Sequence, residues 1–328
     1  MAPQILLLIT GLVLLIKGAD WLVDGASALA KKHHVSNLAI GLTIVAFGTS
    51  LPELIVSTYA SYEGHTDILL GNIIGSNNFN LFVILGISGL IAPLLVRSST
   101  IKIEIPISIV AVILLYLMAG SSIPWSNSKL SASEGLVFLT LFILFLIYVY
   151  LYSKKNPEKE PEINIKTLGT WKIWTMIVLG LVMLALGGRW IVDSSVKIAV
   201  LFGISERIIG LTILAIGTSL PELATSVIAA IKKNNDIAIG NIVGSNIFNI
   251  LLILGVSSLI RPIPYSSTFN IDIYILLIGT VLLLLALWLK KDKHLDRGIA
   301  GLLLLIYVVY MVFVIKFPES DLIELIIK

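Results

Sequence analysis

GLTIVAFGTSLPEL, at residues 41–54, returns almost unchanged as GLTILAIGTSLPEL at residues 210–223. These stretches open two longer segments, 41–93 and 210–262, which align without a gap at a constant offset of 169, and 31 of the 53 paired residues are identical. The same segments also contain the matched stretches GNIIGSNNFN and GNIVGSNIFN. Chance does not produce such agreement, so the chain contains two homologous halves.

The composition places both halves in a membrane. Of the 328 residues, 57% are hydrophobic and 13% are charged, and the mean hydropathy is +1.00. A soluble domain carries about 25% charged residues. The deficit excludes a soluble globular protein, a disordered chain and a nucleic-acid-binding protein. The absence of cysteine excludes disulfides, thiol nucleophiles and cysteine metal sites.

Apolar runs long enough to cross a membrane predict an all-α membrane protein with ten transmembrane helices. The first run is not a cleaved signal peptide, because no basic segment precedes it and Lys17 lies on its far side. We expect a first five-helix repeat at 1–152, a cytoplasmic linker at 153–170 and a second repeat at 171–328. The ten predicted spans are 4–28, 38–61, 69–92, 103–120, 134–152, 172–200, 208–231, 237–260, 271–289 and 298–316.

The loop charges predict the orientation. The loops after the odd-numbered spans, including the linker, hold 15 Lys and Arg residues, whereas the loops after even-numbered spans and the C-terminal tail hold 5. Because positive residues collect in the cytoplasm, we expect both termini outside, in the plasma (inner) membrane. Five spans per half then require the halves to enter the membrane in opposite orientations. Inverted repeats of this kind are typical of transporters, with the site near the bilayer midplane. A duplicated scaffold without a site is the alternative.

Each repeat places one carboxylate, Glu53 or Glu222, inside an apolar span. A charge at the centre of a membrane helix costs about 2.5–3.5 kcal/mol on insertion scales, so such residues usually face the protein interior and carry function. The alternative is a structural ion pair with a basic residue inside a span. The candidates for such a partner are Lys17, Arg189 and Lys197.

The residues just before each carboxylate predict a break in the helix. Pro52 has no N–H, so the carbonyl of Gly48 loses its hydrogen-bond donor, and Pro221 has the same effect in the second repeat. We therefore expect carbonyls near residues 46–49 and 215–218 to become available as ligands. Thr49 and Ser50 would share one helical face with Glu53. A proline kink without a binding role is the alternative.

The following span of each repeat carries polar residues four apart on one helical face. These are Asn72, Ser76 and Asn80 in the first repeat and Asn241, Ser245 and Asn249 in the second. Nearby glycines allow helices to approach closely. These side chains could bind an ion or could simply hydrogen-bond between helices, and we expect the second role most for Asn72 and Asn241.

The available ligands are oxygens: carboxylates, hydroxyls, amides and carbonyls. The four histidines lie in loops. Hard cations fit this set, whereas Zn²⁺ and copper do not. Mg²⁺ rarely enters an all-protein cage, so the set favours Ca²⁺ and Na⁺. No nucleotide-binding motif is present. We therefore expect a protein that uses an ion gradient or conducts passively, with no permanently bound cofactor, and with membrane lipid as its surroundings.

At these residues the chain resembles the cation/calcium antiporter superfamily, and is most similar to its prokaryotic sodium/calcium exchangers. The doubled GTSLPE and GNxxGSNxFN motifs look like the family's α-repeats. The resemblance implies a core of spans 2, 3, 7 and 8, with a loosely packed pair, 1 and 6, that slides across it during alternating access. It also implies four ion sites, with Ca²⁺ at the centre and Na⁺ on the flanks.

Carried over by motif position, the resemblance implies twelve ligand residues. The central Ca²⁺ ligands would be Glu53, Glu222 and the carbonyls of Thr49 and Thr218. The flanking Na⁺ ligands would be Ser50, Ser245 and the carbonyl of Ala46 on one side, and Ser219, Ser76 and the carbonyl of Ala215 on the other. Asn80 and Asn249 would complete the layer.

Asn249 departs from several relatives, including the potassium-dependent ones, which carry Asp at this position. Its neutral side chain argues against K⁺ co-transport. The sequence thus predicts a secondary antiporter, not an enzyme, that exchanges Na⁺ for Ca²⁺ electrogenically. Ca²⁺/H⁺ exchange by the same two glutamates is the alternative. An intramembrane hydrolase would need a base that the spans lack, and a passive channel would not need opposed repeats.

Overall fold

The computed structural model describes residues 2–119, 129–155, 168–201 and 215–316. The regular secondary structure of the described residues is helical apart from four two-residue strands. Within it, eight helices are long and apolar enough to cross a membrane, and a bent helix pair, Asn37–Thr49 with Leu51–Glu63, makes up to nine. The predicted seventh span, 208–231, is described only from residue 215 onward. The all-α membrane architecture is therefore confirmed, while the number ten stays a prediction.

The first half of the chain contains a long first helix, a broken second span and three further spans. Its elements are α1 (Ala2–His33), α2 (Asn37–Ile40), η1 (Gly41–Val45), α3 (Ala46–Thr49), α4 (Leu51–Glu63), α5 (Thr66–Asn78), η2 (Phe79–Ile84), α6 (Leu85–Ile91), β1 (Leu94–Leu95), η3 (Thr100–Glu104), α7 (Ile105–Ala119), β2 (Lys129–Leu130) and α8 (Ala132–Lys155).

The second half follows the same order. Its elements are α9 (Thr170–Leu201), α11 (Ala215–Thr218), α12 (Leu220–Ile231), α13 (Asn235–Ile247), η5 (Phe248–Ile253), α14 (Leu254–Ile260), β3 (Ile263–Pro264), η6 (Ser267–Phe269), α15 (Asn270–Leu289), β4 (His294–Leu295) and α16 (Arg297–Lys316). The predicted linker, 153–170, falls mostly outside the described residues, as do residues 210–214 of the second repeat segment.

The two repeats share their backbone irregularities. A helix breaks at Ser50 (φ −84°, ψ 7°) and again at Ser219 (φ −88°, ψ 6°). The π-helical segments η2 and η5, which widen the helix by one residue per turn, begin at residues 79 and 248. Both correspondences have the offset of 169 found in the sequence. Similar sequences therefore adopt the same local conformation, and π-segments are frequent at functional sites.

The break at Ser50 has the cause expected from the sequence. Pro52 lacks an N–H and its ring clashes with the carbonyl four residues earlier, so an uninterrupted helix is disfavoured there. The span bends by 49° at this point. The same Leu-Pro-Glu triplet follows Ser219, where proline occupies the first turn of α12, a position that tolerates it. Each break places a glutamate in the first turn of the helix that follows.

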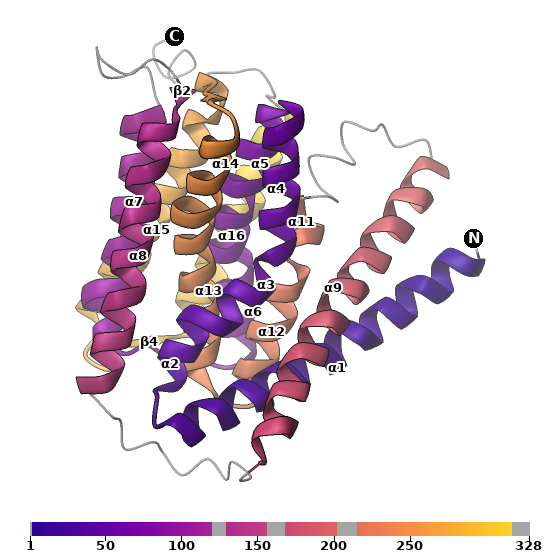
Figure 1. Ribbon diagram of the computed structural model, residues 1–328, viewed down its shortest axis with the longest axis vertical. Helices are drawn as coiled ribbons and strands as arrows, with labels where there is room; N and C mark the ends of the chain where they lie inside the picture. Colours follow the sequence, from indigo (N-terminus) through magenta and orange to yellow (C-terminus); the bar gives the residue numbers. More distant parts are fainter. Residues whose placement is uncertain (1, 120–128, 156–167, 202–214, 317–328) are drawn as a thin grey trace. The chain divides into compact units, whose positions relative to one another are not determined.

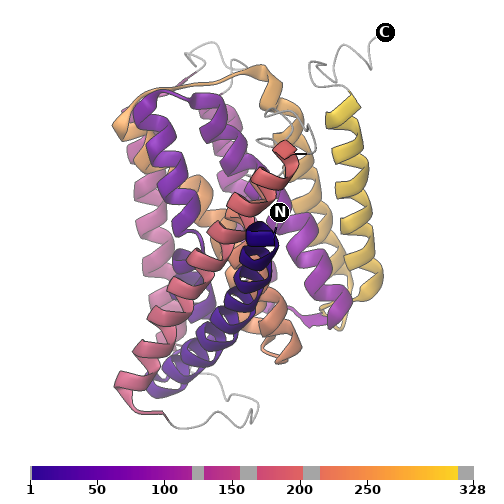
Figure 2. The ribbon, with the colours of Figure 1, turned by 90° about the vertical axis from the view of Figure 1, so that its right-hand side faces the viewer.

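The chain divides into two compact units: unit 1 is residues 1–52 and 145–245, and unit 2 is residues 53–144 and 246–328. In unit 1, α1 and α9 lie side by side and antiparallel (Figures 1 and 2). Glycines make this approach possible. A Cβ at Gly11 would lie 2.9 Å from the Gly187 carbonyl oxygen, and one at Gly18 would lie 2.8 Å from that of Gly180. Only residues without a side chain fit.

Unit 1 also contains a polar clamp at the end of α12. The ammonium of Lys232 lies 2.7 Å from the Asp20 carboxylate and 2.6 Å from that of Asp24, one turn apart on α1. Close by in the sequence, the amide of Asn234 donates to Ser27 on α1 (2.9 Å). These contacts tie α1 to α12 as well as to α9.

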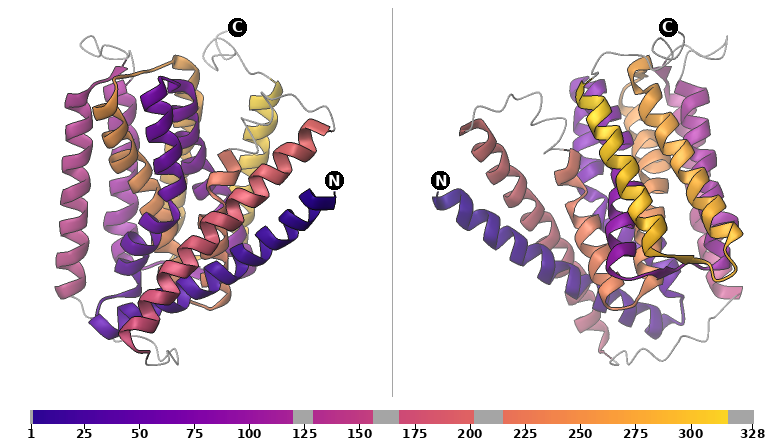
Figure 3. Two further views of the ribbon diagram at one scale, coloured as in Figure 1. Left: turned by 45° about the vertical axis from the view of Figure 1, so that its right-hand side comes forward. Right: turned by 180° about the vertical axis from the view of Figure 1, so that it is seen from behind.

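In unit 2, α16 packs on α6, and the right-hand view of Figure 3 shows α15 beside α16. A Cβ at Gly86 would lie 2.7 Å from Leu304 Cγ, so α16 rests closely on this glycine. Two short antiparallel strand pairs, β1 with β4 and β2 with β3, join loops of this unit. Each unit contains residues from both of the repeats predicted from the sequence. The boundaries of the repeats remain a prediction.

The glycine contacts between α1 and α9 predict that Gly→Ala substitutions change stability differently at a packed glycine and at an open one. In Gly180→Ala, the new Cβ would lie 2.8 Å from the Gly18 carbonyl oxygen and 2.9 Å from Leu22 N. Because backbone must move, we expect a loss of about 1–3 kcal/mol in stability. Gly301→Ala is the control, since nothing lies within 4 Å of its Cβ. There we expect no loss, or a gain of up to about 1 kcal/mol from helix propensity. Thermal unfolding in detergent measures both, and equal effects would contradict the close-packing argument.

Candidate ion-binding site

Glu222 is buried in unit 1, with 1% of its surface exposed. It lies in the first turn of α12, directly after the break at Ser219. The unpaired N–H groups of a helix N-terminus stabilise a negative charge in this turn. Pro221 restricts the backbone to a conformation that suits the start of a helix. The same short motif therefore sets both the helix break and the position of the carboxylate.

Two hydroxyls surround the Glu222 carboxylate. Ser50 Oγ, at the end of α3, donates to Glu222 Oε1 (2.9 Å) and lies 3.0 Å from Ser245 Oγ on α13. Ser50 is 3% exposed and Ser245 is fully buried. Three oxygens from three helices therefore meet at one point. We call Glu222, Ser50, Ser245, Thr49 and Asn241 the Glu222 cluster.

Asn241 connects the helices of this cluster. Its side-chain amide donates to Ser226 Oγ (2.9 Å) and to the Glu222 carbonyl (3.4 Å), while its Oδ1 accepts from Thr49 Oγ1 (3.1 Å). All of its polar atoms are thus engaged by protein. This supports the interpretation of Asn241 as a residue that hydrogen-bonds between helices rather than a ligand.

No cationic side chain neutralises Glu222 in the described part of the chain. Its Oε2 is buried and has no hydrogen-bond partner there. Arg189 pairs instead with Asp193 on its own helix (3.6 Å), and both side chains are more than half exposed. Lys17 and Lys197 are exposed. The alternative of a structural ion pair to Glu222 from these three residues is therefore wrong.

Unit 2 contains a second buried polar group, formed by Asn77, Asn80, Asn246 and Asn249, which we call the amide cluster. Asn80 donates to Asn246 Oδ1 (3.1 Å), and Asn249 donates to Asn77 Oδ1 (3.1 Å). Asn77 and Asn246 also exchange longer bonds with each other's carbonyls, both 3.5 Å. Each bond has its counterpart at the offset of 169. The cluster is therefore built symmetrically from the two repeats.

The amide cluster leaves two oxygens unused. The Oδ1 atoms of Asn80 and Asn249 are buried without a hydrogen-bond partner in the described residues. Because their N–H₂ groups are committed to Asn246 and Asn77, only the oxygens can face a ligand. A pair of unengaged amide oxygens suits a hard cation.

The remaining predicted residues are placed as follows. Glu53 and Ser76 are buried in unit 2, and Asn72 donates to Ser57 there (3.0 Å). Thr218 and Ser219 are buried in unit 1, and Ala215 begins α11. The Ala46 carbonyl, expected to be available, instead accepts from Ser50 N (3.0 Å) and Thr49 Oγ1 (3.4 Å). A cation at that carbonyl would have to share it with these donors.

Two functional candidates were missed from the sequence, Asn77 and Asn246. They occupy the same place in the two GSN motifs, and the offset of 169 alone could have singled them out. In the described residues, no group of three or more His, Cys, Asp or Glu side chains could hold a metal ion. Any cation here therefore relies mainly on neutral oxygens around single carboxylates.

Comparison with known proteins agrees with this donor set. The family model described as sodium/calcium exchanger protein matches residues 3–151 and 172–316. The chain belongs to this family. The sodium/calcium exchanger family consists of antiporters, so this chain is a membrane transporter and not an enzyme. Na⁺ and Ca²⁺ are transported ions in the family rather than resident cofactors.

Individual relatives cover almost the whole exchanger. The protein of Alkalimonas amylolytica that is named "putative antiporter CaxA" is 41% identical over 311 residues, which is 92% of this chain and 95% of CaxA. The sodium/calcium exchanger MaX1 of Methanosarcina acetivorans is 31% identical over 343 residues, covering 94% and 97%. A solved structure of the sodium-calcium exchanger NCX_Mj, soaked with 2.5 mM Na⁺ and 0.1 mM Ca²⁺, matches with a TM-score of 0.80 at 33% identity, over 94% of this chain and 97% of that one.

The amide cluster predicts energetic coupling between Asn80 and Asn246. Removing either side chain breaks one buried hydrogen bond, at a cost of about 1–3 kcal/mol. A double-mutant cycle with Asn80→Ala and Asn246→Ala should give a coupling energy of about 0.5–3 kcal/mol. The control cycle joins Asn80→Ala with Thr280→Ala, because Thr280 bonds only its own helix at Leu276, and should be additive. Unfolding in detergent measures both cycles, and additivity in the first would contradict the network.

Proposed function

We propose that this protein is a secondary antiporter that exchanges Na⁺ for Ca²⁺ by alternating access, electrogenically and without K⁺. The single observation that carries the proposal is the Glu222 cluster. A carboxylate that is 1% exposed, with one oxygen unbonded, has lost its water without gaining a cation from the described protein. Isolating an ionised carboxylate in this way is very costly. The cluster is complete only with a bound cation or a proton.

The ligands in the cluster favour Na⁺ and Ca²⁺. Ser50 and Ser245 offer hydroxyl oxygens 3.0 Å apart beside one carboxylate oxygen. Oxygen ligands without nitrogen or sulfur select hard cations. Two glutamates, Glu53 and Glu222, would balance the charge of one Ca²⁺. MaX1 and NCX_Mj carry the name of sodium/calcium exchangers, which supports Na⁺ and Ca²⁺ as the two transported ions.

We assign ligand roles to the motif residues as a hypothesis. Ca²⁺ would be held by the carboxylates and by the carbonyls of two threonines, and Na⁺ by hydroxyls and by the carbonyls of two alanines. The proposed ligands are Ala46, Thr49, Ser50, Glu53, Ser76, Asn80, Ala215, Thr218, Ser219, Glu222, Ser245 and Asn249.

The proposed transport cycle uses ten helices in two inverted repeats. The antiparallel packing of α1 and α9 supports it, because Gly11 and Gly180 occupy equivalent positions in the repeats, as do Gly18 and Gly187. Equivalent helices that run in opposite directions are what inversion requires. We further propose an inner-membrane location with both termini outside, in keeping with the name of a relative, the inner membrane protein YrbG of Escherichia coli, which is 35% identical over 306 residues. We expect lipid but no nucleic acid or nucleotide as partner.

Ca²⁺/H⁺ exchange is the competing function, because a proton can also complete the Glu222 cluster. The two functions differ in the gradient that drives them. In proteoliposomes, an outward Na⁺ gradient should drive Ca²⁺ uptake, and a proton uncoupler should leave this uptake unchanged. Uptake that follows a pH gradient and ignores Na⁺ would favour the proton-coupled alternative.

Removing either proposed Ca²⁺ charge should stop transport. Glu53→Gln and Glu222→Gln each leave a single carboxylate to offset the desolvation of a divalent ion, so we expect Ca²⁺ flux to fall at least about 100-fold. Flux of ⁴⁵Ca into proteoliposomes measures this. Asp272→Asn is the matched control. Asp272 accepts a hydrogen bond from Tyr310 (2.5 Å), and Asn can accept the same bond, so transport should continue. Near-normal flux in either glutamate variant would refute the assignment.

The charge count predicts an electrogenic cycle. Two glutamates carry a total charge of −2, one Ca²⁺ neutralises them, and the three Na⁺ implied by the family resemblance leave a surplus of +1. A membrane potential should then bias each cycle by about 2.3 kcal/mol per 100 mV. Measuring Ca²⁺ flux at clamped potentials, with and without K⁺, tests both statements. Flux that ignores voltage, or that requires K⁺, would overturn the proposal.

Asn249→Asp should change this behaviour. The substitution adds a third carboxylate near the amide cluster, where Asn249 Oδ1 is buried without a partner. Unlike an amide, the new group can bind and release a proton, so flux should become sensitive to pH. Asn249→Gln is the control, because it keeps the side chain neutral, and it should leave the pH profile unchanged. An unaltered profile in Asn249→Asp would show that the side chain only hydrogen-bonds between helices.

A further inference from the structure

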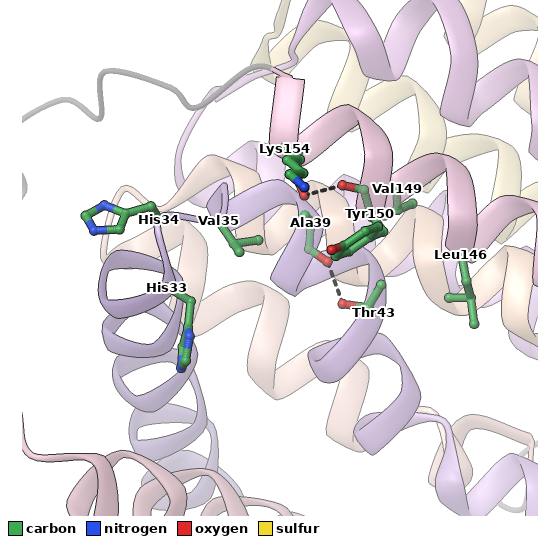
Figure 4. A pocket seen from close by; sticks show the side chains of 10 residues that line it. His33, His34, Val35, Ala39, Thr43, Leu146, Val149, Tyr150 and Lys154 are labelled. Atoms are coloured by element: carbon green, nitrogen blue, oxygen red, sulfur yellow. Dashed lines mark hydrogen bonds between the residues drawn. The ribbon is translucent and has the colours of Figure 1, made fainter.

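Unit 1 contains a pocket that shares no residue with the proposed ion ligands. Its volume is about 550 Å³. It lies where α1 ends, α2 begins and α8 ends (Figure 4). In Figure 4, His33 and His34 lie on one side of Ala39, and Tyr150 and Leu146 lie on the other. The lining residues are His33, His34, Val35, Ala39, Thr43, Leu146, Val149, Tyr150, Ser153 and Lys154.

The pocket lies at the boundary between membrane and water. The candidate membrane span of α1 runs from Pro3 to His33, and that of α8 runs from Ala132 to Lys154. Both therefore end among the residues that line the pocket. Lys31 and Lys32 precede the pocket on α1, and clusters of this kind between membrane helices bind anionic lipid headgroups.

The pocket presents cationic and hydrogen-bond-donating groups without any acid. The side chains of His33, His34 and Lys154 have no hydrogen-bond or ion-pair partner in the described residues, and no Asp or Glu lines the pocket. The wall hydroxyls are already engaged, since Thr43 donates to the Ala39 carbonyl (2.6 Å) and Ser153 to that of Tyr150 (2.9 Å). The free donors are thus an ammonium and two imidazoles, which can donate in either protonation state.

His34 is held in a backbone conformation that favours glycine. Its φ is 53°, and Val35 N closes the end of α1 by donating to the Ala30 carbonyl (3.0 Å). A glycine at such a helix end would avoid the strain. The chain instead carries a side chain with ring donors at this point. Strained residues of this kind cluster at binding sites.

The flank of the pocket is apolar. Val35, Ala39, Leu146 and Val149 form much of the wall. On α8, Ile147 is 48% exposed and Leu151 is 51% exposed. Because α8 crosses the membrane, these side chains face lipid tails. A ligand with a negative head and apolar chains would satisfy both surfaces at once.

We propose that this pocket binds the anionic headgroup of a membrane phospholipid, with Lys154 at the phosphate and with His33 and His34 contacting the headgroup from the α1 side. The headgroup would then link the end of α1 to the end of α8. The proposal does not depend on which ions the exchanger transports. Inorganic phosphate has the same head chemistry without the chains, so the two sources must be distinguished by experiment.

The test compares lipid retention between matched variants. Purified protein would be equilibrated in nanodiscs of equal parts phosphatidylcholine and phosphatidylglycerol, and native mass spectrometry would count the retained phosphatidylglycerol. The pocket variant combines His33→Ala, His34→Gly and Lys154→Gln, with glycine chosen because it suits the left-handed backbone. Loss of the Lys154 charge alone should weaken binding about fivefold, and loss of the two ring donors weakens it further, so retention should fall at least about tenfold.

Three controls give every outcome a meaning. A variant with Lys102→Gln, Lys233→Gln and Lys291→Gln removes three cations outside the pocket and should retain phosphatidylglycerol, as should Lys154→Arg. If the triple pocket variant fails to fold, Lys154→Gln alone should still lower retention. Equal retention in the pocket variants and the unmodified protein would overturn the site. Complete displacement of the lipid by millimolar inorganic phosphate would overturn the lipid and leave a simple anion site.

Discussion

A buried carboxylate with no cation from the protein is the constraint on which this structure depends. Glu222 lies in a helix that begins within an apolar span, and one of its oxygens has no partner in the described residues. Water would normally stabilise that charge, and a hydrocarbon environment removes it. The surrounding structure compensates with a helix N-terminus, the Ser50 hydroxyl and the Ser245 hydroxyl. The negative charge of the carboxylate itself remains without a positive partner. A transported ion can supply that positive charge and later remove it.

Helix breaks make this arrangement possible. In a continuous helix, the backbone N–H and C=O groups inside the membrane all hydrogen-bond to one another. The free N–H groups of its first turn would lie at the membrane surface. The breaks at Ser50 and Ser219 create helix N-termini inside the spans. The π-helical segments η2 and η5 then begin two residues after the asparagines of the GSN motifs. Irregular backbone is tolerated inside a membrane only where protein or a ligand satisfies it, and the proposed ion ligands lie at these irregularities.

Glycine and amide contacts serve different purposes in the two units. In unit 1, the glycines of α1 and α9 bring the backbones of two long helices into direct contact. A contact of small residues suits the sliding of this helix pair that the proposed alternating access requires. In unit 2, the amide cluster joins segments through directional hydrogen bonds. Such bonds hold a fixed geometry, as a site that discriminates between ions requires.

The sequence by itself determined the membrane class, the two repeats, the helix breaks and the burial of Glu53 and Glu222. These features depend on residue type and on spacing, which a one-dimensional pattern contains. It did not reveal Asn77 and Asn246, the carbonyl of Ala46 that is already bonded, or the pocket between α1 and α8. Ser50 and Ser245 are 195 residues apart in the chain, yet their hydroxyls lie 3.0 Å apart. Only the tertiary structure decides such partners, because a hydrogen bond forms or fails over fractions of an ångström that spacing along the chain does not specify.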